Sequence, residues 1–341
     1  MIIDYYHRMI ITRTPYRISF FGGGTDHPKW YREHGGAVIS TTIDKYCYVS
    51  CRDLPPFFEH KHRIVYSHIE TVNETDDIQH PVVRECIKYV KYGPGLEIHH
   101  DGDLPARSGL GTSSSFTVGL LHALHAMQGN QIDKHFLATQ AIEVEQEKMR
   151  ETVGSQDQVA AAYGGLNLIE FREDGTIIVS PVVLAVAARQ ELQRHLMLFF
   201  TGFTRMSSLL EKKKLDNFAK RETELLALRS LVDAAQQALS ANAIDQIGPL
   251  LHESWCLKQA LAEGVTTETI DNIYQEALRA GATGGKLLGA GGGGFLLLFV
   301  PPACHTAVRE RLHRLLEIPF LLEEGGSTVV FRQNSSPHLA T

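Results

Sequence analysis

The sequence has little cysteine, and its cysteines do not form the pattern of a metal site or a disulfide framework. They are odd in number and include no CxxC pair: Cys47, Cys51, Cys86, Cys256 and Cys304. We therefore expect no zinc site and no disulfides, and we expect a protein of the reducing cytoplasm. Cys47 and Cys51 lie in a strand-like run, where small core residues are the simplest interpretation.

Long apolar runs and an excess of positive charge are also missing. The longest apolar run, FLLLFV at 295–300, is far too short to span a bilayer. The opening residues MIIDYYHRMIITRTP lack a charged segment followed by a sustained apolar one, so we expect no signal peptide. The net charge of −6 offers no general field for nucleic acid or anionic lipid. We expect no nucleic-acid or membrane partner, so any anionic ligand must be held by local groups.

A chain of 341 residues with 43% hydrophobic content is long enough for two domains. In the first part, apolar and β-branched runs predict strands at 10–21, 37–51, 94–99, 166–171 and 176–183. Helical periodicity covers 113–128 and 133–149, with Asp133 as the N-cap of the second helix. The sequence thus predicts an α+β fold.

A break near 185–192 (LAVAARQE) separates these elements from a second set. The second set is predicted to contain a strand at 195–200, helices near 206–239, 243–261 and 267–280, a glycine-rich hairpin at 284–300, a helix at 303–316, and strands near 318–322 and 327–332. Gly281 would end the helix at 267–280.

The stretch LPARSGLGTSSSFT at 104–117 places small side chains directly ahead of an apolar helical pattern. Backbone N–H groups at Gly109, Gly111 and the following residues, together with the positive end of the helix, could surround phosphate oxygens. A serine-rich helix N-cap is an equally good interpretation of this stretch on its own.

The stretch RISFFGGGTDHP at 17–28 reads as a strand that ends in a glycine turn followed by Thr25, Asp26 and His27. A carboxylate placed just past such a turn is well positioned to bind ligand hydroxyls. Taken alone, an ordinary turn stabilised by the aspartate is the commoner explanation.

The run GAGGGG at 289–294 has the spacing of a dinucleotide fingerprint but precedes a strand-like segment, so the Rossmann interpretation fails on context. A Walker A loop fails as well, because the Gly285-Lys286 pair has Ala280 and Leu287 where that motif needs glycine and a hydroxyl residue. The run is more typical of a backbone that approaches another backbone or a ligand closely than of a flexible turn.

Together, the three stretches resemble the GHMP kinases, the superfamily of galactokinase, homoserine kinase, mevalonate kinase and phosphomevalonate kinase. They stand in the expected order, and the resemblance covers about residues 9–333. It implies a two-domain fold: a domain like that of ribosomal protein S5 at 9–187, with the ATP loop and a catalytic aspartate, and a ferredoxin-like domain at 188–335, with the glycine-rich motif. ATP would lie in the cleft between the domains.

Further segments, TVGSQDQVAAAYGGLN at 152–167 and TGFTRMSS at 201–208, resemble the bacterial D-glycero-D-manno-heptose 7-phosphate kinase branch. That branch phosphorylates the anomeric C1 hydroxyl of its substrate. Kinases of unphosphorylated sugars, such as L-fucose or a hexose, look similar in places and are the alternative. A regulator of the same fold that only senses sugar and ATP is a further alternative, although the residues needed for catalysis are all present.

By this resemblance, the cofactors are ATP and Mg²⁺. The loop residues that bind ATP would be Pro105, Ser108, Gly109, Leu110, Gly111, Thr112, Ser113 and Ser114. Ser113 and Glu145 would be the metal ligands, Glu145 because it precedes Asp157 by twelve residues. Without the resemblance, Glu145 would be interpreted as a solvated charge on a helix face.

Asp157 would be the catalytic aspartate and Arg17 the cation beside it. Residues expected at the sugar site are Arg17, Gly24, Thr25, Asp26, His27, Asp157, Arg205, Gly291 and Gly292. Arg205 is the candidate for binding a distal phosphate, with Lys45 as the second choice; for both, an ordinary surface cation remains an open interpretation. The expected partners are therefore ATP and a sugar phosphate, in a monomer or homodimer.

Overall fold

The structure is a computed structural model that describes residues 8–106, 108–202 and 207–333. Its larger sheet has nine strands: β1 (Met9–Phe21), β2 (Gly36–Asp53), β3 (His62–Val65), β4 (Ile69–Val72), β5 (Leu96–Gly102), β6 (Asn167–Phe171), β7 (Ile177–Pro181), β12 (Leu322–Glu323) and β13 (Thr328–Arg332). The smaller sheet has four: β8 (Leu196–Gly202), β9 (Gly284–Leu287), β10 (Gly294–Phe299) and β11 (Leu316–Glu317).

The helices are α1 (Pro28–His34), α2 (Pro81–Val90), α3 (Thr112–Met127), α4 (Lys134–Glu143), α5 (Gln156–Tyr163), α6 (Val186–His195), α7 (Ser207–Asn217), α8 (Glu222–Ser240), α9 (Ile247–Ala260), α10 (Glu268–Arg279) and α11 (His305–Arg311). None of the helices in the described ranges is long and apolar enough to cross a membrane.

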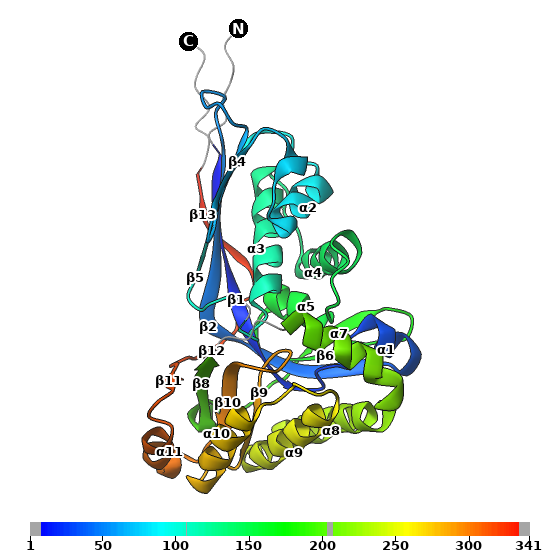
Figure 1. Ribbon diagram of the computed structural model, residues 1–341, viewed down its shortest axis with the longest axis vertical. Helices are drawn as coiled ribbons and strands as arrows, with labels where there is room; N and C mark the ends of the chain where they lie inside the picture. Colours follow the sequence, from blue (N-terminus) through cyan, green and yellow to red (C-terminus); the bar gives the residue numbers. More distant parts are fainter. Residues whose placement is uncertain (1–7, 107, 203–206, 334–341) are drawn as a thin grey trace.

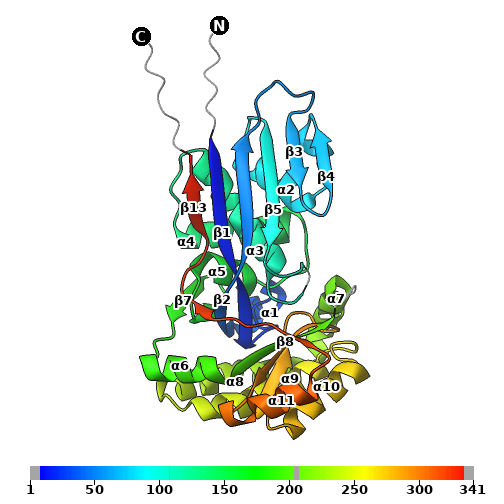
Figure 2. The same cartoon turned by 90° about the vertical axis from the view of Figure 1, so that its left-hand side faces the viewer.

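The larger sheet is built around β1 and β2, whose residues alternate between the helices and the opposite face. Helices α2, α3, α4 and α5 lie on one side of this sheet (Figure 1), and in Figure 2 they lie behind it. Cys47, Val49 and Cys51 point toward this helical layer and are fully buried, which confirms that the two cysteines are small core residues. Helix α3 packs directly on β1 and β2 and carries the predicted phosphate loop at its N-terminus.

The smaller sheet has the strand order β11-β8-β10-β9, with every pair antiparallel. Strand β10, one of its two central strands, contains most of the run FLLLFV, and all the residues of β10 are buried. Helices α8 to α11 lie beside this sheet at the lower end of the molecule (Figure 2). The prediction of an α+β fold is confirmed, and the structure forms two sheets with helices packed beside them.

The second half differs from the sequence-based expectation in several elements. The expected break at 185–192 is helix α6, in which Ala188, Leu192 and His195 recur at helical spacing and are buried. The expected helix at 206–239 is two helices, interrupted by a 3₁₀ turn at Phe218–Lys220. The predicted strand at 318–322 is wrong, since Pro319 has no N–H for a strand ladder; the short strands β11 and β12 lie on either side of it.

The last strands of the chain belong to the larger sheet. β13 pairs with β1, and β12 pairs with β2, in antiparallel register. The sequence-based division instead groups 188–335 together with the smaller sheet. The chain therefore passes from the larger sheet to the smaller one and returns, which no local sequence pattern indicates.

Candidate active site

The three glycine-rich stretches meet where the two sheets adjoin. The N–H of Arg17 in β1 donates to the carbonyl of Leu110 in the loop ahead of α3, over 3.0 Å. A Cβ added at Gly109 would lie 2.6 Å from the carbonyl oxygen of Leu288, and one added at Gly294 would lie 2.4 Å from that of Ser108. Backbone therefore touches backbone here, as the glycine run predicts.

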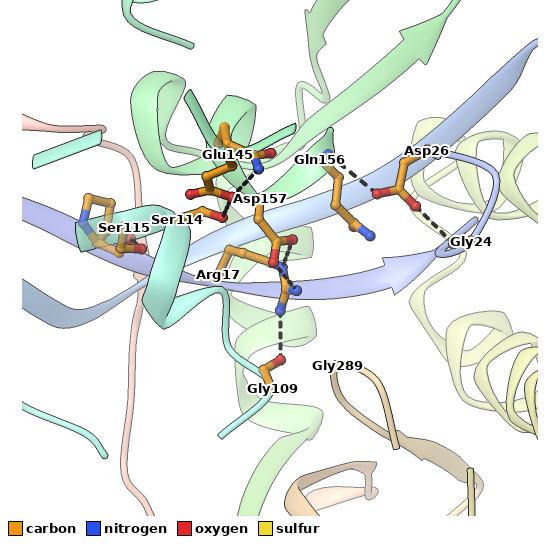
Figure 3. Close-up of polar contacts among 12 residues, drawn as sticks. Arg17, Gly24, Asp26, Gly109, Ser114, Ser115, Glu145, Gln156, Asp157 and Gly289 are labelled. Carbon is orange, nitrogen blue, oxygen red and sulfur yellow. Dashed lines mark hydrogen bonds and ion pairs between the residues drawn. The ribbon is translucent and has the colours of Figure 1, made fainter. Parts of the chain in front are cut away.

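Arg17 and Asp157 form a two-pronged ion pair in the centre of this region (Figure 3). The guanidinium Nε donates to Asp157 Oδ1 over 2.7 Å, and Nη2 donates to Oδ2 over 2.8 Å. Its remaining nitrogen, Nη1, donates to the carbonyl of Gly109 over 2.7 Å. Arg17 is 4% exposed, whereas the Asp157 side chain keeps 25% of its surface. One arginine thus fixes both the carboxylate and the loop at 108–111, which is the predicted nucleotide loop, as bidentate geometry allows.

The loop itself leads into the N-terminus of α3. Gly111 is the residue before the helix and has a left-handed backbone with φ of 71°. A Cβ there would stand 3.1 Å from Arg17 Cγ and 3.3 Å from Asp157 Oδ2, so only glycine lets the loop lie against the pair without displacing it. Ser108 is buried, and its Oγ has no hydrogen-bond partner among the described residues. These features suit a site where an anion meets the start of a helix.

Glu145 lies in a π-helical segment, Val144–Lys148, that continues α4. It is 1% exposed, so its interpretation as a solvated surface charge is wrong. Its Oε2 accepts from Ser114 Oγ over 2.9 Å and from Gln158 Nε2 over 2.5 Å. Burial raises the pKa of Glu145 to about 7, against the opposing effect of its hydrogen bonds.

The surroundings of Glu145 fit a divalent cation. Its Oε1 is buried and has no hydrogen-bond partner among the described residues, and a nearby cation would favour the charged carboxylate that burial disfavours. Ser113, the expected second ligand, is exposed, and it is the neighbouring Ser114 that contacts Glu145. The described ranges contain no cluster of three or more His, Cys, Asp or Glu side chains suited to a metal. An ion held here would thus take most ligands from phosphates and water, as Mg²⁺ commonly does.

The turn after β1 places Asp26 near Asp157 (Figure 3). Asp26 is 3% exposed. Its Oδ1 accepts from the N–H of Gly24 over 2.8 Å, and its Oδ2 accepts from that of Gln156 over 3.3 Å. The carboxylate thus joins the glycine turn to the start of α5, beside the Arg17–Asp157 pair (Figure 3).

Several other residues expected at the sugar site have structural partners. The buried hydroxyl of Thr25 donates to the carbonyls of Gly22 and Ala37, so it holds the turn instead of facing a ligand. His27 caps α1, with Nδ1 accepting from the N–H of Lys29. Lys45 pairs with its neighbour Asp44 at 3.1 Å.

The expected position of Arg205 lies outside the described residues. Gly291 and Gly292 are in the β9–β10 turn, but they contact Val265: a Cβ at Gly291 would lie 2.6 Å from its carbonyl oxygen, to which the Gly292 N–H also donates. The glycines that touch the nucleotide loop are instead Gly289 and Gly294.

Sequence reasoning missed several residues of this site. Gln158 binds Glu145 Oε2, and its place directly after Asp157 in the Gly-Ser-Gln-Asp-Gln-Val segment was the available signal. Lys258, from α9, donates to the carbonyls of Leu287 and Gly289 over 2.7 and 2.6 Å and so holds the glycine-rich turn. A lone lysine in an amphipathic helix gives no signal of that role.

The chain is similar to known proteins in both of its parts. The model of the GHMP kinases N-terminal domain matches residues 81–165, and that of the GHMP kinases C-terminal region matches residues 235–317. The D-glycero-alpha-D-manno-heptose 7-phosphate kinase of Campylobacter jejuni is 30% identical over 307 residues, which cover 86% of this chain and 90% of that protein. The bifunctional fucokinase/GDP-fucose pyrophosphorylase of Arabidopsis thaliana is 25% identical over 89% of this chain, which spans only 31% of that longer protein.

Solved structures share the fold over nearly the whole chain. A D-glycero-D-manno-heptose 1-phosphate kinase from Bacteroides thetaiotaomicron has a TM-score of 0.78 at 23% identity and covers 96% of this chain and 100% of its own. The galactokinase of Lactococcus lactis, complexed with galactose, has a TM-score of 0.74 at 19% identity and covers 94% of this chain and 95% of its own. With both family domains matched and a relative aligned along most of its length, the chain belongs to the GHMP kinase family.

Proposed function

We propose that this protein is an ATP-dependent sugar kinase that phosphorylates the anomeric C1 hydroxyl of D-glycero-D-manno-heptose 7-phosphate to the 1,7-bisphosphate. The observation that carries the proposal is the Arg17–Asp157 pair, which lies between the nucleotide loop and the Asp26 turn. The Campylobacter jejuni relative, whose name specifies a heptose 7-phosphate, supports this choice of substrate. We place the reaction in the cytoplasm.

In this proposal Asp157 accepts the proton of the C1 hydroxyl. The hydroxyl oxygen forms a bond to the γ-phosphorus of ATP, and the bond between that phosphorus and the bridging oxygen of ADP breaks. Such general-base help contributes about 10²–10⁴-fold in rate. Arg17 keeps the carboxylate in one orientation, because both of its oxygens are bonded by the same planar group. Its charge also stabilises the negative charge on the transferring phosphoryl group.

The loop from Pro105 to Ser114 would bind the triphosphate at the positive end of α3. A bound Mg²⁺ would supply neutralisation of phosphate charge, with Ser113 and Glu145 as its protein ligands. Asp26 and His27 would bind sugar hydroxyls, with Gly24 leaving room at the turn. Arg205 would hold the distal phosphate through a bidentate contact.

Release of ADP across a panel of free sugars and sugar phosphates tests the proposal. We expect turnover of the heptose 7-phosphate, and we expect Arg205→Ala to raise KM for this substrate at least tenfold with KM for ATP unchanged. Lys213→Ala removes an exposed cation of the nearby helix α7 and is the matched control, with little expected effect.

Efficient turnover of an unphosphorylated sugar, with no gain from a terminal phosphate, would contradict the proposal that the substrate is a heptose 7-phosphate. It would favour the alternative of a kinase for an unphosphorylated sugar such as L-fucose, which the Arabidopsis thaliana relative supports. Sugar binding without ADP release under any condition would instead favour a non-catalytic regulator.

A further inference from the structure

Two buried polar side chains, Ser19 and Gln156, lie close to Gly23 in the turn that carries Asp26. Ser19 is 6% exposed and Gln156 is 8% exposed. Among the described residues, Ser19 Oγ and Gln156 Oε1 have no hydrogen-bond partner. A buried polar atom left without a partner is costly, and in native proteins it is uncommon.

Both side chains belong to elements that position the reacting groups. Ser19 follows Arg17 by two residues in β1, so the two side chains lie on the same face of the strand. Gln156 directly precedes Asp157, and its N–H donates to Asp26 Oδ2. In Figure 3 its side chain extends into the space between Asp26 and Asp157.

The two polar ends converge on one glycine. A Cβ added at Gly23 would lie 3.6 Å from Ser19 Oγ and 3.7 Å from Gln156 Nε2. Because Gly23 has no side chain, the hydroxyl and the amide both lie beside a position that a side chain would otherwise fill.

We propose that Ser19 and Gln156 form a hydroxyl-binding subsite beside Asp26, which recognises ring hydroxyls of the sugar other than the one that reacts. This inference rests on the proposed sugar kinase function and names residues that determine its specificity. Gln156 Oε1 needs a donor, and a hydroxyl supplies one, whereas an ionised phosphate or carboxylate does not. The Asp26 carboxylate also repels an anion, so the distal phosphate of a substrate must bind elsewhere.

Gly23→Ala is a sharp probe of this subsite. The added methyl would make only ordinary van der Waals contacts, and Gly23 is not among the glycines with a left-handed backbone, so the variant should fold normally. The methyl would nevertheless cover the approach to both polar ends. Gly22→Ala could not serve, because its Cβ would lie 1.9 Å from the carbonyl oxygen of Ala37.

We expect Gly23→Ala to raise KM for the sugar roughly tenfold or more, as the loss of two hydrogen bonds predicts. KM for ATP should stay within about twofold and the melting temperature within about 2 °C. Gly93→Ala is the control, because a Cβ there meets nothing within 4 Å. An unchanged sugar KM in Gly23→Ala would overturn the subsite.

Ser19→Ala separates a binding role from a structural one. Removing a hydroxyl that lacks a partner should leave the melting temperature equal or higher, while KM for the sugar rises. A monodeoxy sugar that lacks the recognised hydroxyl should bind the wild type more weakly but should lose little further affinity in Gln156→Ala.

A fall in stability without a change in sugar KM would assign Ser19 a structural role and overturn the inference. A wild-type protein that turns over no sugar would overturn the proposed function itself. An active wild type whose sugar KM is insensitive to all three substitutions would overturn only the subsite.

Discussion

Arg17 binds both oxygens of Asp157 with one guanidinium and also holds the Gly109 carbonyl, so a single residue aligns the proposed base with the loop ahead of α3. The chemistry of this pair therefore depends on charge and on geometry together. A substitution that keeps the shape of Asp157 and removes its charge can separate the two.

Asp157→Asn is expected to lower kcat by about 10²–10⁴-fold, because an amide cannot accept the proton of the sugar hydroxyl. KM for ATP and for the sugar should change less, since the side chain keeps its size and its place in α5 and still accepts one of the two hydrogen bonds from Arg17. Steady-state kinetics with a melting curve for each protein would measure both effects. A variant with wild-type kcat would remove Asp157 from the reaction.

Two neighbouring serines near the proposed magnesium site, Ser113 and Ser114, should respond differently to replacement by alanine. Ser113 is exposed, so Ser113→Ala should raise the magnesium concentration needed for half-maximal activity and leave the melting temperature unchanged. Ser114 holds the buried Glu145, so Ser114→Ala should change both quantities, with about 1–3 kcal/mol lost from the free energy of unfolding. Activity titrated with magnesium, alongside thermal denaturation, checks this. Equal magnesium dependence in Ser113→Ala and wild type would exclude Ser113 as a ligand.

At the scale of elements, the β9–β10 turn contacts two different neighbours through glycines. A Cβ at Gly289 would lie 2.4 Å from Gly109 Cα in the nucleotide loop, whereas one at Gly291 would meet the backbone of Val265. Both glycines have positive φ, of 70° and 112°. A substitution therefore strains the backbone at either position. The two substitutions should differ in effect because each displaces a different neighbour.

Gly289→Ala should raise KM for ATP at least tenfold, because the methyl pushes the nucleotide loop away from the turn. Gly291→Ala should mainly lower the free energy of unfolding, by about 1–3 kcal/mol, with a smaller effect on ATP. Chemical denaturation and ATP kinetics on the two variants give the comparison. If Gly291→Ala impaired ATP binding more than Gly289→Ala, the assignment of these contacts would be wrong.

The elements that sequence could predict are those with strong local signals. β1, β2, β10 and α3 show clear apolar patterns, and α10 ends just before Gly281, as expected. Helix α6 was missed because its buried face consists of Ala188, Leu192 and His195, which is a weak apolar stripe.

The site shows the same division between local signals and tertiary contacts. Arg17, Asp26 and Asp157 stand in motifs, and the structure brings them together. Ser19 and Gln156 are ordinary polar residues in sequence, and only their burial distinguishes them. Ser114 was expected in the nucleotide loop, but its contact with Glu145 depends on a helix 31 residues away, which sequence spacing does not reveal.

On the scale of the whole molecule, the two sheets are joined by contacts that cross between distant parts of the chain. Lys286, in β9 of the smaller sheet, donates to the carbonyl of Phe20 in β1 over 2.8 Å. Near the middle of β1, Ser327, which lies just ahead of β13, has its Oγ 2.9 Å from Thr14 Oγ1 and 3.0 Å from His122 Nδ1 in α3. Side-chain contacts therefore stabilise the return of the chain to the larger sheet, in addition to the backbone pairing of β13 with β1.

Because His122 takes part in these contacts, the free energy of unfolding should depend on pH. Burial, with smaller contributions from the charges of His125 and Arg332, lowers the pKa of His122 from its ordinary value of 6.5 to about 4. The unfolded chain therefore binds more protons between these pH values, so the folded state gains stability as pH rises from about 4 to 6.5 and loses it as pH falls. This one group should contribute on the order of 2 kcal/mol across that window.

Denaturation of wild type and His122→Asn at several pH values measures the contribution. The variant keeps a polar atom near Ser327 but does not titrate, so its curve should be flatter than that of wild type. His62, whose pKa burial also lowers to about 4, titrates in both proteins and cancels in the comparison. Parallel curves for the two proteins would show that His122 does not carry the effect.

The pairing of β13 with β1 also bears on how the protein is synthesised. A ribosome makes β1 first, yet the strand that covers its outer edge follows the entire smaller sheet in chain order. Until then β1 presents an open row of N–H and C=O groups, the kind of edge that recruits strands from other chains. The smaller sheet has all its strands before that point and can fold while the larger one still waits. Translation that stalls or ends before residue 328 would thus leave a nascent chain that can aggregate through the open edge of β1, and chaperones would have to shield that edge.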